Sequence, residues 1–179
     1  MSNIPTAYMW LKTLQPLPRM IAQALKEYGV LEAQGATDNP VILGWAEEIG
    51  ANVLRLYHAD DVPWCGLFMA VVAKRAGKQV PSQPLWALSW TRFGEATTTP
   101  SLGDVLVFRR NGGGHVALYV GEDEQAYHCL GGNQSDSVCI TRVAKARLYA
   151  ARRPDYQVTP ATASPYRLAS TGGLSHNEA

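Results

Sequence analysis

The chain has 179 residues, of which 46% are hydrophobic and 17% charged, and this length predicts one domain with a substantial core. The formal net charge is +1 and no run of lysine or arginine exceeds two residues, so the sequence lacks the basic patch by which proteins bind nucleic acids or anionic membranes. The longest apolar run, Cys65 to Ala73, is far shorter than the roughly 20 residues that cross a bilayer, so we expect no membrane span.

Three helices are predicted in the first half of the chain. Apolar residues recur at spacings of three and four over 17–28, which is typical of an amphipathic helix. A second helix is expected over 40–49, with Asp38 or Asn39 as its N-cap and a proline at its first position. The third is expected within residues 61–77, with Pro63 in its first turn, and its uncharged interior from Leu67 to Ala73 predicts a helix that is buried on all sides.

The second half changes to short segments rich in Val, Leu, Tyr and Phe, separated by Gly, Asn and Asp, which is typical of strands. After a short helix over 84–93, these segments predict an antiparallel meander of about five strands at 104–109, 115–120, 125–130, 138–143 and 148–152. Helices followed by a sheet indicate an α+β fold with the buried helix packed on the sheet. We expect residues 1–155 to form a single domain and residues 156–179, rich in Thr, Ser, Pro, Ala and Gly, to form a flexible tail.

Cys65 lies near the N-terminal end of the predicted buried helix, directly after a proline and a tryptophan. A side chain of Asp60 or Asp61 can cap this helix, which leaves the sulfur among unpaired backbone N–H groups at the positive end of the helix dipole. Such a position lowers the pKa of a cysteine and favours a thiolate nucleophile, and the same N–H groups can stabilise an oxyanion. Free cysteine is otherwise a common core residue, and we keep that interpretation for Cys129 and Cys139.

A nucleophilic thiol needs a base, and His115 is the favoured one among the four histidines. It opens a strand after three glycines and shares a face with Ala117, so small residues leave space around the imidazole. His58 lies in a predicted loop and His176 in the predicted tail.

Two residues are candidates for orienting the imidazole. If residues 121–124 form a hairpin loop, Ala117 pairs with His128, which places His128 on the face that carries His115. Asn133 follows two glycines that can swing its amide towards the same place, although strict alternation from Leu130 points it away. Strand alternation alone does not decide between Asn133 and His128.

The motifs PWCGLF, GDVLVFRR, GGHVALYVG and LGGNQ occur in the order and spacing seen in NlpC-type and CHAP-type cell-wall amidases and peptidases. The chain resembles a phage-associated and bacterial subgroup of that superfamily over Ala22 to Pro154. The resemblance implies a papain-like α+β fold in which Cys65 attacks an amide of peptidoglycan and His115 acts as base and then acid. It favours Asn133 as the orienting residue, with His128 as the reserve.

The resemblance departs from the NlpC type around the nucleophile, where those endopeptidases usually carry Asp-Cys-Ser-Gly. Here Trp64 precedes the cysteine and Gly66 follows it, and Asp61 is the carboxylate that can substitute in recognising a substrate amine. Asp61 and Trp64 are therefore the predicted substrate contacts. Trp86 and Trp90 are further rings that can face sugars, with simple packing as the alternative for every tryptophan.

The function predicted first is a thiol hydrolase that cuts an amide bond of peptidoglycan, either as a stem-peptide endopeptidase or as an N-acetylmuramoyl-L-alanine amidase, without a metal or cofactor. The N-terminus lacks a signal peptide pattern, so we expect synthesis in the cytoplasm and delivery to the wall as a phage lysin or as a bacteriolytic toxin effector of a secretion machine, the latter with a cognate immunity protein. The alternatives are an acyl-transferring or deamidating toxin with the same triad, a non-catalytic wall-binding module, and a metal site of Cys65, His115 and His128.

Overall fold

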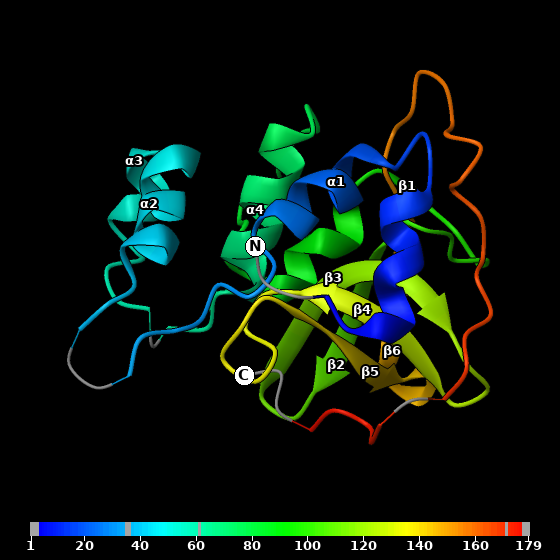
Figure 1. Cartoon of the computed structure of the whole chain (residues 1–179). Coiled ribbons are helices and arrows are strands. Elements are labelled where there is room, and N and C mark those ends of the chain that lie inside the picture. The colour runs from blue at the N-terminus through cyan, green and yellow to red at the C-terminus, as the bar shows by residue number, and fades with distance from the viewer. Residues whose placement is uncertain (1–3, 35–36, 61, 171, 177–179) are drawn as a thin grey trace.

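The computed structural model describes residues 4–34, 37–60, 62–170 and 172–176, and it confirms the α+β class (Figure 1). In chain order the helices are η1 (Thr6–Thr13), α1 (Arg19–Lys26), α2 (Pro40–Ile49), α3 (Ala51–Leu54), α4 (Cys65–Arg75), η2 (Ala87–Arg92) and η3 (Lys145–Arg147), where η marks a 3₁₀ helix. The strands are β1 (Glu95–Ala96), β2 (Val105–Arg110), β3 (Gly113–Glu122), β4 (Ala126–Gly131), β5 (Cys139–Ala144) and β6 (Leu148–Arg153). No helix within the described ranges is both long and apolar enough to span a bilayer.

The predicted helices are present, and their ends follow local chemistry. Helix α2 begins at Pro40 as predicted, because the Asn39 side chain accepts a hydrogen bond of 2.8 Å from the N–H of Val41. Helix α4 is buried from Cys65 to Ala73, as its uncharged interior predicts, and only its last two residues, Lys74 and Arg75, are exposed. Helix α1 is shorter than expected at both ends, with Pro18 at its N-cap and Glu27 at its C-cap.

The sheet has six strands in the order β1-β6-β2-β3-β4-β5, and all neighbours are antiparallel. The prediction of a simple meander is therefore wrong after β5, since β6 returns to pair with β2 and the short β1 adds an edge. Only the three residues of η3 connect β5 to β6, a span of about 6 Å at the rise of a 3₁₀ helix. Four flat inter-strand spacings would need about 19 Å, so the sheet must curl strongly.

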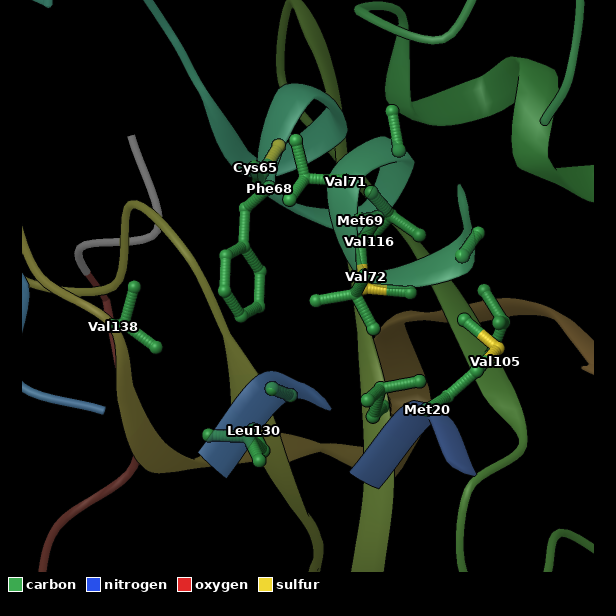
Figure 2. Packing of buried hydrophobic residues seen from close by; sticks show 14 of the residues in the cluster. Met20, Cys65, Phe68, Met69, Val71, Val72, Val105, Val116, Leu130 and Val138 are labelled. Atoms are coloured by element: carbon green, nitrogen blue, oxygen red, sulfur yellow. The ribbon is translucent and has the colours of Figure 1, made fainter. Parts of the chain in front are cut away.

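Helix α4 lies between the sheet and α2, and it forms the centre of the main core (Figure 1). Its side chains Phe68, Met69 and Val72 lie near Val116 and Leu130 of the sheet, with Cys65 at the first turn (Figure 2). A smaller cluster occupies the other face of the sheet and includes Leu106, Phe108, Ala117, Tyr119, Cys129, Val143 and Ala151. The sheet thus separates two apolar layers, with β3 contributing alternate residues to each.

The segment after Asp155 makes contacts that the prediction of a flexible tail did not anticipate. The ring of Tyr166 lies 4.6 Å from that of Trp10, and backbone hydrogen bonds join Glu122 to both Tyr166 and Leu168. In Figure 1 this orange segment runs along the outside of the sheet.

Candidate active site

Cys65 is the first residue of α4, so the helix begins later than the prediction that placed Pro63 in its first turn, and no side chain of the described residues caps it. Trp64 occupies the N-cap, while the carboxylate of Asp60 accepts the N–H groups of Ala33 and Asn39, each at 2.8 Å. Asp60 therefore fixes the segments before α2 instead of capping α4. Asp61, the predicted substrate carboxylate, lies outside the described residues.

Burial raises the pKa of the Cys65 thiol, and the side chain is only 3% exposed. The backbone N–H groups of Val116 and Gly66 lie against the sulfur and act in the opposite direction, as does the charge of Arg110, but burial is the larger effect. The expectation of a resident thiolate is thus wrong for this structure, because the helix end that offers the N–H groups is also sealed from water. A thiol in this position needs a base.

One segment, Pro84–Leu88, covers Gly66, which follows Cys65, and Gly114, which precedes His115. A Cβ on Gly66 would lie 2.4 Å from the carbonyl oxygen of Pro84, and one on Gly114 would lie 2.7 Å from the Leu88 side chain. The glycine after Cys65 and the glycine before His115 therefore allow this segment to lie directly on the site.

His115 is fully buried and is held by Gln134. The imidazole Nε2 and the amide Oε1 are 3.0 Å apart. The amide nitrogen of Gln134 donates to the carbonyls of Cys129 at 3.1 Å and Cys139 at 2.7 Å, so the oxygen must be the atom that faces the ring. An amide oxygen accepts from an N–H, hence the neutral imidazole carries its proton on Nε2 and its lone pair on Nδ1.

In the structure Cys65 lies against Val116, the residue that follows His115, but it meets β3 on the face opposite the His115 ring. Val116 belongs to the core around α4, and its N–H lies against the sulfur. The His115 ring stacks on Phe108 of the opposite layer, with ring centroids 6.3 Å apart. The β3–β4 pairing ends at Leu118 and Leu130, so Val116 has no partner in β4, although it still pairs with Val107 of β2.

Gln134 is the residue that the sequence analysis missed, although it stands in the GGNQ motif next to the favoured candidate. Asn133 is buried with a φ of 56°, and its Oδ1 forms no hydrogen bond with any described residue. In the observed register Leu130 lies in the main core, opposite the layer that His115 faces, so strict alternation would turn Asn133 towards the ring. The left-handed conformation of Asn133 breaks that alternation, and Gln134 reaches His115 instead. No sequence rule distinguished the two adjacent amides.

His128 does not orient His115, because the register of the β3–β4 hairpin differs from the predicted one. His128 pairs with Gly121, after an irregularity that follows Tyr119, and its side chain lies on the side of the helices. There its Nδ1 is 2.7 Å from the hydroxyl of Tyr8 and its Nε2 is 2.9 Å from Asp123. Asp123 also accepts the N–H groups of Gln125 and Ala126, which tightens the turn, and β3 extends to Glu122 beside it.

Trp64 is not a substrate contact in this structure, since it is fully buried, lies 5.9 Å from the ring of Trp45 and donates to Glu32 at 3.0 Å. Trp90 is also buried and donates to the carbonyl of Pro84. Trp86, by contrast, is 56% exposed in the middle of the covering segment. Of the tryptophans named from the sequence, it is the one that a ligand can reach.

The described residues include no group of His, Cys, Asp and Glu side chains placed to hold a metal ion, and His128 lies in a separate network from Cys65 and His115. Comparison with models of protein families gives no match, and none of the curated proteins is significantly similar to the chain.

Proposed function

We propose that the protein is a cysteine hydrolase of papain-like arrangement that cuts an amide bond of peptidoglycan. The observation that carries the catalytic part is the pairing of Gln134 with Nε2 of His115, at the point of β3 where the Cys65 sulfur meets the backbone. It leaves the basic lone pair on Nδ1, which is the nitrogen not occupied by the amide. The substrate class is inferred from the motifs around Cys65, His115 and Gln134.

In this proposal the imidazole of His115 reaches past the edge of β3 from the face opposite Cys65, and its Nδ1 takes the proton of the Cys65 thiol as the sulfur attacks the amide carbon at that edge. The raised pKa of the thiol suits a base that acts during attack rather than a stored thiolate. The C–N bond then breaks, the imidazolium gives its proton to the leaving amine, and a thioester remains on Cys65. Water hydrolyses the thioester, with His115 accepting the water proton and returning it to the sulfur, so the products are an amine and a carboxylic acid.

Backbone groups at the start of α4 supply the oxyanion stabilisation in this mechanism. The N–H groups of Cys65 and Gly66 already act on the sulfur, and a tetrahedral intermediate formed there would place its oxygen near the same donors. Each such donor contributes about 3 kcal/mol to the transition state in comparable enzymes.

Substrate entry requires the covering segment Pro84–Leu88 to move, because Cys65 and His115 are both buried.

The burial of the sulfur is also the observation that favours the second candidate function, a wall-binding module in which Cys65 is a core residue. An acyl-transferring or deamidating enzyme would use the same residues with an amine in place of water. Delivery by a phage or a secretion machine, with an immunity protein in the second case, remains part of the proposal.

The test is digestion of purified sacculi by the wild-type protein and by Cys65→Ala, followed by mass spectrometry of the soluble fragments. We expect new amine and carboxylate ends from the wild type and none from the variant, and the fragment masses identify the bond. Cys129→Ala serves as the matched control, because this buried cysteine lies in the other apolar layer. Fragments from Cys65→Ala at the wild-type rate would refute the thiol mechanism, and binding to sacculi without any cleavage would favour the wall-binding module.

A further inference from the structure

A cavity of about 470 Å³ lies beside the covering segment, on the side of β2 and β6. The side chains that matter for its chemistry are Lys78, Trp86, Arg92, Arg109, Tyr149 and Asp155. We call it the arginine cavity. It includes neither Cys65 nor His115.

Cations dominate the arginine cavity. Neither Arg92 nor Arg109 forms an ion pair with a carboxylate of the described residues, and both side chains are exposed. Lys78 donates to the backbone carbonyl of Asp155, which supplies the one carboxylate of the lining. Three cations against one anion leave an excess of positive charge, and guanidinium groups bind carboxylates with two parallel hydrogen bonds.

Flat rings accompany the two guanidinium groups. The guanidinium of Arg109 lies 3.5 Å from the ring centroid of Tyr149, which holds it in place by a cation–π contact. Trp86 is 56% exposed and Tyr149 is 47% exposed, so apolar faces remain open next to the charges. This combination is typical of a site for a ligand that carries both a carboxylate and a flat or apolar part.

The arginine cavity adjoins the candidate active site through two contacts. Leu88 lines the cavity and also touches Gly114, the residue before His115. Arg109 lies opposite Gly114 in the β2–β3 pairing. A chain held in the cavity would thus extend to the covering segment over Cys65.

We propose that the arginine cavity is the subsite that binds a free carboxylate of the peptide stem of peptidoglycan, with Arg92 and Arg109 as its ligands and the faces of Trp86 and Tyr149 alongside. This inference rests on the proposed function for the identity of the ligand. Stem peptides carry free carboxylates along their length, which matches the excess of positive charge. Positioning of the acidic stem by this subsite places a neighbouring amide near Cys65.

Isothermal calorimetry in a Cys65→Ala background tests the subsite without turnover. The probes are the free stem tetrapeptide, the same peptide with its carboxylates converted to amides, and the neutral sugar N,N′-diacetylchitobiose. We expect the acidic peptide to bind best and both neutral probes to bind at least about tenfold more weakly. Arg92→Gln and Arg109→Gln should each weaken the acidic peptide by about tenfold.

Lys12→Gln, which removes the same charge from exposed η1 outside the cavity lining, is the matched control and should bind like the background. Equal affinity for acidic and amidated peptide, or arginine variants that bind like the Lys12 control, would overturn the subsite. Acidic-peptide binding that depends on the arginines, in a wild-type protein that leaves sacculi intact, would refute the hydrolase and keep the subsite. Cleavage of sacculi with an unchanged KM in both arginine variants would refute the subsite and keep the hydrolase.

Discussion

Replacing Gln134 by methionine keeps the shape of the side chain and removes its amide. The wild-type amide bonds two buried groups, Nε2 of His115 and the carbonyl of Cys129, and the half-buried carbonyl of Cys139. A buried polar group left without its partner costs about 1–3 kcal/mol, so the loss of all three bonds should lower the free energy of unfolding by about 3 kcal/mol. For a chain of this size that corresponds to a fall in Tm of about 6–12 °C.

The same substitution should also lower kcat by about 100-fold, because the ring of His115 loses the bond that sets its orientation and tautomer. KM should change little, since Gln134 is buried and cannot touch substrate. The assay is chemical unfolding together with sacculus turnover across pH. A loss of stability without a change in kcat would mean that Gln134 is only structural.

Asn133→Gly is the matched control for Gln134. It removes an amide whose Oδ1 bonds no described residue, and glycine tolerates the φ of 56°. We expect a loss of about 1 kcal/mol or less in stability and near-normal kcat. If Asn133→Gly lost more turnover than Gln134→Met, the sequence-based choice of Asn133 would be right and the assignment of Gln134 would fail.

Three further predictions concern Gly66, Cys65 and His128. Gly66→Ala should lower the free energy of unfolding, measured in urea, by about 1–3 kcal/mol, because its Cβ would lie 2.4 Å from a backbone oxygen. The control Gly44→Ala in α2 has open space around its Cβ and should raise the free energy of unfolding by about 0.5–1 kcal/mol. Equal effects of the two substitutions would contradict the contact at Gly66. Alkylation of Cys65 by iodoacetamide, followed by peptide mass mapping, should be slow at pH 6 and rise through pH 9, since burial raises the pKa of the thiol; a rate already at its plateau below pH 7 would show a thiolate instead. Burial lowers the pKa of His128, so the unfolded chain binds a proton at this residue more readily than the folded protein, and stability should fall as the pH drops below about 6.5. The pKa of Asp123 is also lowered, so this carboxylate should add a further loss of stability below about pH 4. His128→Asn should flatten the dependence of Tm on pH between 7 and 5, and an unchanged slope would assign it to other groups.

Local patterns predicted most elements of this fold because the forces behind them act over a few residues. The Asn39-Pro40 pair sets the start of α2, and the uncharged run after Cys65 predicts a helix with no exposed side. The predicted strands failed where pairing is non-local, at β1 and β6, and in the β3–β4 hairpin, where the irregularity after Tyr119 changes the register. The amino-acid sequence of β6 does not indicate whether the strand pairs with β2 or with β5. The curl of the sheet brings β6 next to β2.

The sequence by itself predicted Cys65 and His115 as the two central residues of the candidate site. The structure has Cys65 as the first residue of α4 and His115 in β3, two residues after the strand begins at Gly113. Only the tertiary structure decided which side chain holds the imidazole, because the left-handed conformation of Asn133 breaks the strand alternation and brings Gln134 to the ring. It also reversed the expected pKa of the thiol. The N–H groups at the start of α4 follow from local sequence, whereas the exclusion of water from the sulfur comes from Pro84–Leu88 and β3, which lie far away in the chain.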